Sequence, residues 1–199
     1  MPVAMRAQHS LLACARGLIW AVLAGFAWTA GSVSANTASP HPAPPPEIAA
    51  ALPAAILQGR GLLRFFGLAV YEARLWAAAG FESERYPAQP FALELRYARA
   101  LAGPAIAERS IAEMRRSGDI DEEQARRWQQ AMTRAFPDVV AGDRLTGLSQ
   151  PDGSTRFFLN GQPTSSLVDA AFTRRFFGIW LAPTTSEPSL RRQLIGQVQ

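Results

Sequence analysis

Cysteine, histidine and lysine are nearly absent from this chain of 199 residues. The only residues of these kinds are Cys14, His9 and His41, and all 20 basic residues are arginines. Beyond position 41 the chain therefore has no side chain for Ser-His-Asp or Cys-His catalysis, a Schiff base, thiol redox chemistry or a His or Cys metal site. We expect no metal and no cofactor, and any chemistry must use carboxylates, tyrosine, serine, threonine or arginine.

The charges of the chain are evenly mixed. The formal net charge is +4, and without Arg6 and Arg16 the remaining 18 arginines face 16 acidic residues. Because basic and acidic residues alternate along the chain, a nucleic-acid-binding stripe is not indicated. We expect no nucleic-acid partner. The hydrophobic content of 48% is sufficient for the core of one domain.

Residues 1–35 have the pattern of a secretory signal peptide. A positive start is followed by the uncharged run Gly17–Ala30, and Val33-Ser34-Ala35 fits a cleavage site. The run is shorter than the roughly 20 residues that a spanning helix needs. We therefore expect a periplasmic or secreted protein with no stable membrane insertion after cleavage. An uncleaved membrane anchor is the alternative.

The rest of the chain divides into a linker and one domain. Residues 36–55 are rich in proline and alanine and predict an extended linker, with a short helical turn near its end. Residues 56–199 have strand-like segments first, helix-like segments in the middle, then strands and helices again, which predicts an α+β domain with a largely antiparallel sheet. We expect strands at 62–70, 91–99, 144–149 and 155–159, and helices at 103–116, 121–136, 170–177 and 189–195.

An apolar segment from Leu62 to Val70 is the centre of this pattern. Apolar residues fall on both parities, so we expect a strand buried on both faces, with a bulge at Gly67. Arg64 and Tyr71 are its polar groups. Arg64 pairs with an internal carboxylate, reaches solvent or anchors an acidic ligand, because an unpaired buried guanidinium is very costly. Tyr71 either caps an edge of the core or lines a pocket.

Further candidates come from the next strand and helix. Tyr97 and Arg99 share the apolar parity of the strand at 91–99, although Arg99 can also emerge into solvent at its end. Ser110 lies near the buried face of the helix at 103–116, where a serine often bonds to its own helix. The predicted ligand-binding residues are Arg64, Tyr71, Tyr97, Arg99, Ser110 and Glu113.

Several motifs together resemble the bacterial branch of the chalcone isomerase-like family. They are G-x-G-x-x-R-F-x-G-x-x-V-Y-x-A-x-L-W from Gly59, R-S-I-x-E-M from Arg109, Trp128, Phe136-Pro137, Gly142-Asp143-Arg144 and F-F-G-I-W-L from Phe176. The resemblance covers residues 57–196. It implies a chalcone isomerase-like fold, an antiparallel sheet with helices layered on one face. The family includes isomerases that close a flavanone ring, and fatty-acid-binding proteins that hold a carboxylate with Arg and Tyr.

The resemblance also bears on activity. The threonine, tyrosine and asparagine of the isomerases fall near Phe66, Ile106 and Glu113, so none of the three is retained. The arginine of the fatty-acid-binding relatives falls near Leu63, next to Arg64. We therefore expect a non-catalytic domain that binds a small amphipathic or acidic ligand such as a fatty acid. The alternatives are an isomerase or intramolecular lyase that uses Glu113 or a tyrosine as acid/base, and a structural domain that binds a protein partner.

Overall fold

The computed structural model describes residues 42–197. Within this range six antiparallel strands, paired in chain order, form one sheet. The predicted signal peptide and the first part of the linker lie outside these residues. The strands are β1 (Ile56–Phe65), β2 (Leu68–Ala77), β3 (Phe91–Tyr97), β4 (Arg144–Ser149), β5 (Ser154–Leu159) and β6 (Gln162–Val168).

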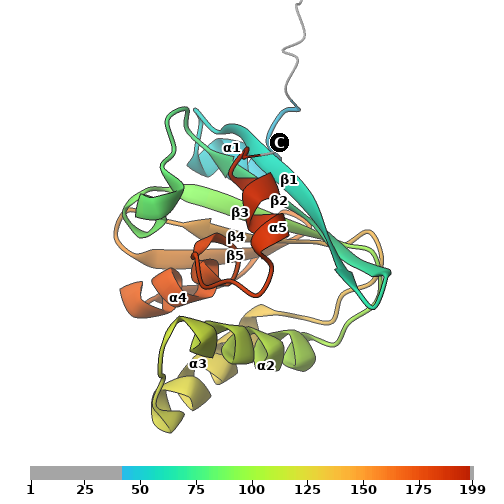
Figure 1. The fold of residues 1–199 in the computed structure, drawn as a ribbon, viewed down its shortest axis with the longest axis vertical. Coiled ribbons are helices and arrows are strands. Elements are labelled where there is room, and N and C mark those ends of the chain that lie inside the picture. Colours follow the sequence, from blue (N-terminus) through green and yellow to red (C-terminus); the bar gives the residue numbers. More distant parts are fainter. Residues whose placement is uncertain (1–41, 198–199) are drawn as a thin grey trace, which may run out of the picture. The chain divides into compact units, whose positions relative to one another are not determined.

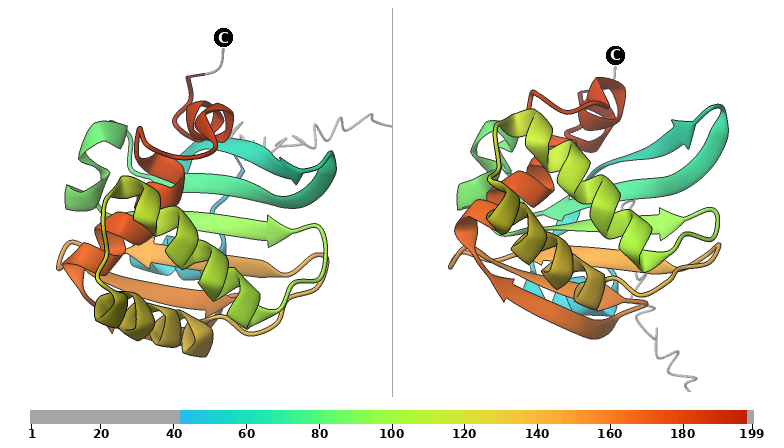
Figure 2. Two further views of the ribbon diagram at one scale, coloured as in Figure 1. Left: turned by 60° about the horizontal axis from the view of Figure 1, so that its bottom comes forward. Right: turned by 90° about the horizontal axis from the view of Figure 1, so that it is seen from below.

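Helices cover both faces of this sheet, but unequally (Figures 1 and 2). The larger helices lie together on one face, and the short α1 lies on the other. The predicted α+β architecture is therefore confirmed. The helices are α1 (Pro46–Ala51), η1 (Ser83–Ala88), α2 (Gly103–Met114), η2 (Arg115–Ser117), α3 (Glu122–Ala135), α4 (Ala170–Leu181) and α5 (Pro188–Leu194). No helix within residues 42–197 has the length and apolar character needed to cross a bilayer.

The segment predicted as one strand buried on both faces is a β-hairpin, which corrects the sequence interpretation. Phe66 and Gly67 have φ angles of 47° and 79° and connect β1 to β2. Positive φ at both central residues is the type I′ geometry that suits a two-residue hairpin. The ladder between β2 and β3 begins at Tyr71, so the end of the hairpin extends past β3 and is exposed. Gly67 therefore marks a turn rather than a bulge, and the irregularities lie elsewhere in the hairpin, including one between Leu63 and Arg64.

The helix α1 explains why β3 is buried on both faces. Its Ile48 is fully buried with Trp76, Ala92 and Leu148. On this face Glu94 is buried and accepts a hydrogen bond of 2.8 Å from Trp76 Nε1. The second half of the expected linker thus contains a helix that packs on the sheet.

The main core lies between the sheet and the larger helices and is rich in aromatic rings. Phe157 of β5 packs edge-on against Phe136 and Phe176, with ring centroids 5.1 and 5.3 Å apart. Phe172 and Phe176 of α4 stack on each other. Trp128 of α3 is buried in the same core.

The helix α4 continues through Gly178, where the sequence predicted that it would break. A Cβ atom at Gly178 would lie 2.9 Å from the hydroxyl of Tyr86, so the glycine permits close approach of two elements. Asp121 and Asp169 cap α3 and α4 by accepting hydrogen bonds from backbone amides.

The helix α5 lies directly on β1 because two glycines of β1 lack side chains. A Cβ at Gly59 would lie 2.1 Å from the carbonyl oxygen of Gln193, and one at Gly61 would lie 2.6 Å from Leu190 Cδ1. Distances this short exclude any larger residue without displacement of the helix. The chain segment that leads into α5 carries Ser186 and Glu187, and it is thereby held beside β1 and β2.

Candidate ligand-binding cavity

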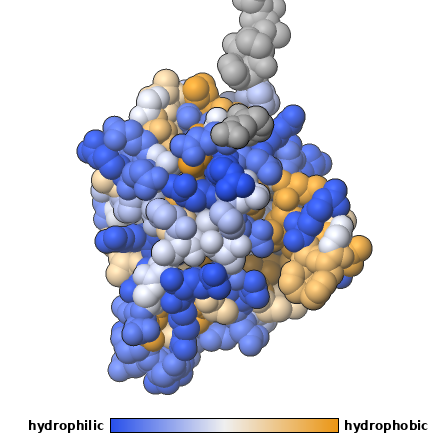
Figure 3. Space-filling view, in the orientation of Figure 1, coloured by the Kyte–Doolittle hydropathy of each residue, from blue (hydrophilic) through white to orange (hydrophobic). Residues whose placement is uncertain are grey.

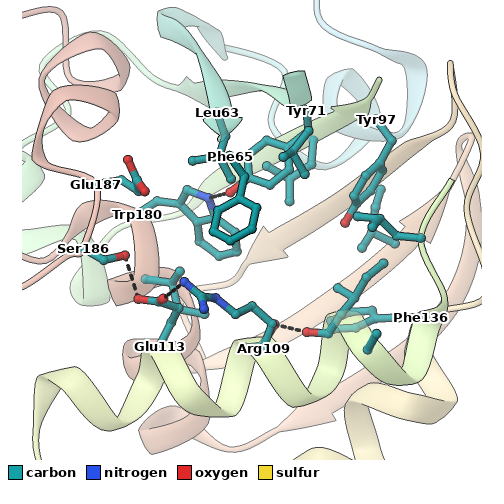
Figure 4. Close-up of a pocket in the computed structure, with 18 of the residues that line it drawn as sticks. Leu63, Phe65, Tyr71, Tyr97, Arg109, Glu113, Phe136, Trp180, Ser186 and Glu187 are labelled. Atoms are coloured by element: carbon teal, nitrogen blue, oxygen red, sulfur yellow. Dashed lines mark hydrogen bonds and ion pairs between the residues drawn. The ribbon is translucent and has the colours of Figure 1, made fainter. Parts of the chain in front are cut away.

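A cavity of about 420 Å³ lies between the sheet and α2, with one wall made by the end of α4 and the segment before α5. This volume is in the range of about 300–1,000 Å³ that is usual for small-molecule sites. All six residues predicted from the sequence line it: Arg64, Tyr71, Tyr97, Arg99, Ser110 and Glu113. The structure therefore brings together side chains from β1, β2, β3, α2 and the loop after β3 (Figure 4).

Tyr71 and Tyr97 reach the cavity together because they are directly opposite in the β2–β3 ladder. Side chains at opposed positions of an antiparallel pair point to the same face. Their rings pack edge to face with centroids 5.9 Å apart. Leu63 of β1 is opposite Tyr71 on the other side and points the same way. One cross-strand row thus supplies three residues of the cavity wall.

Tyr71 is held by a residue that the sequence analysis did not select. Trp180 Nε1 donates a hydrogen bond of 2.9 Å to Tyr71 Oη. Burial raises the pKa of Tyr71 well above its usual value, and the opposing effect of the Trp180 bond is smaller. Burial raises the pKa of Tyr97 as well. Both phenols are therefore neutral hydrogen-bond donors at physiological pH.

Glu113 on α2 is already compensated by surrounding donors. Its carboxylate lies 2.5 Å from the guanidinium of Arg109, accepts a bond of 2.7 Å from Ser186 Oγ, and lies 3.7 Å from Arg116 Nε. Its side chain is only 11% exposed, whereas that of Arg109 is 68% exposed. The charge of Glu113 thus holds Arg109, which lines the cavity and is also largely exposed to solvent.

The cavity has a polar end and an apolar end (Figure 4). Arg109, Glu113, Ser186 and the Trp180–Tyr71 pair lie at the first. Phe136 lies at the second, with further apolar lining from Phe176, Leu95, Leu101, Ile106 and Leu145. The aromatic core described above therefore forms part of the cavity wall. This division between the two ends matches an elongated molecule with one polar terminus.

Arg64 reaches solvent, which is one of the alternatives considered for it, because its strand is not buried on both faces as the sequence predicted. It is exposed near the end of the hairpin and donates a hydrogen bond of 3.0 Å to the carbonyl of Gly67. The reason is that this part of β1 extends past β3, so the surrounding apolar residues do not enclose it. Arg99 is exposed after the end of β3, as its alternative predicted. Both arginines line the cavity near its opening.

Ser110 bonds to its own helix, which is the alternative that the sequence analysis gave for it. Its hydroxyl donates a bond of 2.8 Å to the carbonyl of Ile106, within α2. The residues that sequence reasoning missed include Arg109, Trp180 and Glu187. Arg109 and Trp180 belong to the motifs quoted above, and Arg109 precedes Glu113 by four positions, a helix spacing that predicts the ion pair. Nothing in the sequence predicted that Glu187, from a distant loop, faces the cavity.

Comparisons with known proteins agree with this arrangement. The profile of chalcone isomerase-like proteins matches residues 46–196. A protein of Haemophilus influenzae, described as uncharacterized, is 29% identical over 130 residues, which are 65% of this chain and 62% of that relative. The match thus spans less than two thirds of the relative's length. Among solved structures, a fatty-acid binding protein of Arabidopsis thaliana has a TM-score of 0.56 at 11% identity, over 72% of this chain and 88% of that one. This likeness shows a shared fold.

Proposed function

The chain belongs to the chalcone isomerase-like family, and from this premise we propose that its cavity binds a small amphipathic molecule with an acidic end, such as a fatty acid. The observation that carries the proposal is that a neutral donor and a cation lie, beside Glu113 and Ser186, at one end of a cavity with mostly apolar walls. Tyr71 supplies a phenolic proton, and Arg109 supplies guanidinium N–H groups. A carboxylate is the acceptor that suits both.

The energetics favour such a ligand. A hydrogen bond to a charged group contributes about 1.5–3 kcal/mol net. Each methylene group buried among the apolar residues of the cavity adds about 0.8 kcal/mol. The acidic end thus fixes orientation, and the apolar chain supplies most of the affinity. The fatty-acid binding protein of Arabidopsis thaliana has the same fold, and its name is consistent with this choice of ligand.

Three features support binding without catalysis. Ile106, near the position of the isomerase tyrosine, supplies only apolar surface to the cavity. Glu113 is engaged by Arg109 and Ser186 and is poorly placed to accept a proton from a substrate. The raised pKa of Tyr71 makes it a donor and a poor base.

We also propose export from the cytoplasm, which N-terminal sequencing tests by finding a mature start near Asn36.

The proposed binding is tested by native mass spectrometry of the protein purified from cells without detergent. We expect a co-purifying species that dissociates on activation and has the mass of a fatty acid or a related acidic amphiphile. Addition of oleic acid to delipidated protein should restore the complex and raise the melting temperature. A protein that carries no such species and shows no thermal response to oleic acid would exclude the proposal. Enantioselective flavanone formation from an added chalcone would support the enzymatic alternative.

A further inference from the structure

The end of the β1–β2 hairpin exposes large apolar side chains to solvent. Phe65, Phe66 and Leu68 are 58%, 91% and 60% exposed, and Leu62 behind them is 41% exposed. We refer to residues 65–68 as the hairpin tip. Figure 3 shows an apolar patch at this end of the hairpin, beside a hollow in the surface. Most apolar side chains of this size in the described residues are buried, so the tip is unusual within this protein.

The backbone conformation of Phe66 is unfavourable, in addition to the exposure of its ring to solvent. Its φ angle of 47° lies in the left-handed region, which a bulky residue rarely adopts. Asparagine, aspartate or glycine is the usual residue at this place in a type I′ turn. Phe66 is therefore unfavourable for the free protein in both backbone conformation and solvation. Such an outlier points to a role in which the side chain contacts something other than its own domain.

The charged residue of the hairpin nearest the tip is an arginine. Arg64 directly precedes the tip, whereas Glu72, which pairs with Leu62, and Arg60, which pairs with Arg74, lie farther along the hairpin. The bond from Arg64 to the carbonyl of Gly67 holds its guanidinium at the turn. Exposed aromatic residues beside arginines suit the boundary between water and lipid, where rings enter the headgroup region and guanidinium groups pair with anionic headgroups.

The shape of the tip also favours a lipid surface over a protein. A stable protein interface buries about 800 Å² on each partner, usually over a broad face. A two-residue turn projecting from a sheet offers only a few side chains. The tip is also continuous with the cavity, because Leu63, Arg64 and Phe65 line the cavity next to it.

We propose that the hairpin tip docks on an anionic lipid bilayer and places the opening of the cavity against it. The contact is peripheral: the rings of Phe65 and Phe66 and the side chain of Leu68 enter the headgroup region, and Arg64 pairs with lipid phosphates. The docking itself does not depend on the proposed ligand. Its use for exchange of an amphipathic acid between bilayer and cavity rests on the proposed function.

The test places a tryptophan at the tip of the whole chain, as Phe66→Trp. A matched control, Val168→Trp, places one at another exposed apolar position, 79% exposed on β6. Fluorescence is measured with vesicles of phosphatidylcholine and phosphatidylglycerol whose acyl chains are brominated near the headgroup. We expect quenching of the added tryptophan at position 66 and none at position 168, relative to the parent chain. Every variant has the same N-terminal segment, so any difference in quenching between the variants comes from the position of the added tryptophan.

The electrostatic part is tested with Arg64→Gln and with vesicles of phosphatidylcholine alone. Each change should weaken the apparent affinity for vesicles about tenfold, as measured from the quenching of the tryptophan at position 66. No added quenching at position 66, or equal quenching at both positions, would overturn the proposal. Sedimentation that shows a dimer lost in Phe66→Asn, without vesicle quenching, would assign the tip to contact between copies and would also overturn it. Oleic acid binding without vesicles is measured in parallel, so failure of docking and failure of the proposed function are separable.

Discussion

Trp180 donates the hydrogen bond that joins it to Tyr71, over 2.9 Å. An indole N–H can only donate, so the oxygen of Tyr71 is the acceptor and its own proton is left for another partner. Burial raises the pKa of Tyr71, which keeps that proton in place. A residue of α4 therefore sets the hydrogen-bonding role of a residue of β2, and the pair presents a donor to the cavity.

The first prediction concerns this donor. In Tyr71→Phe the ring remains, but the hydroxyl that serves both Trp180 and the proposed ligand is lost. We expect oleic acid to bind about tenfold more weakly, as measured by titration calorimetry. Tyr86→Phe is the control, because that hydroxyl donates to the carbonyl of Arg174, outside the cavity. Equal loss of affinity in both variants would mean that the effect is structural.

Arg109 provides a second prediction, with a control of the same kind on another helix. Arg109–Glu113 and Arg127–Glu123 are both ion pairs between positions four apart, and their arginines are 68% and 58% exposed. The control pair is exposed on both sides and contributes less than about 1 kcal/mol to stability, whereas Glu113 is only 11% exposed. We expect Arg109→Gln to weaken oleic acid binding about tenfold or more, and Arg127→Gln to leave it unchanged. Unchanged binding in Arg109→Gln would remove this arginine from the site.

The third prediction is a gain of stability at the hairpin tip. Phe66→Asn replaces a bulky residue at positive φ with one that adopts this conformation readily. We expect the free energy of unfolding to rise by about 1 kcal/mol, and the melting temperature to rise by about 2–4 °C. Thermal and urea denaturation measure both quantities. A fall in stability would show that the exposed ring has favourable contacts in the free protein.

The fourth prediction follows from the raised pKa values of the cavity tyrosines. Tyr71 and Tyr97 each have a reference pKa of 10.0 and a higher pKa in the folded protein, mainly because of burial. Above pH 10 the unfolded chain releases these protons first, so stability is retained below that pH and lost as the pH rises toward the folded values. Urea denaturation at increasing alkaline pH should show this loss. The double variant Tyr71→Phe with Tyr97→Phe should show a smaller slope.

The elements that could be predicted from the sequence are those with local signals. Asp121 and Asp169 are helix caps with a simple mechanism, and the alternation from Phe91 to Tyr97 predicted the core face of β3. The strand β6 was missed because Gln162–Val168 is polar and mostly exposed, with little apolar alternation. The burial of Glu94 was missed because it depends on α1, which is distant in sequence and covers only one part of the second face.

The candidate site could be predicted as a set of residues but not as a geometry. All six candidates line the cavity, yet Arg64 is exposed where burial was expected, because a hairpin turn was interpreted as the middle of a strand. An apolar run on both parities fits a buried strand and a projecting hairpin equally well. Because Arg64 is exposed, its replacement in Arg64→Met should cost the free protein little stability.

The contact between α5 and β1 makes the cavity sensitive to residues that never touch a ligand. The bare backbone at Gly59 and Gly61 sets how near α5 lies to the sheet. The segment entering α5 carries Ser186 and Glu187, so the same spacing fixes one wall. A single methyl group at Gly59 would displace α5 and with it that wall, although every residue that lines the cavity would still be present. The shape of the cavity therefore depends on backbone spacing in β1 as well as on the residues that line it.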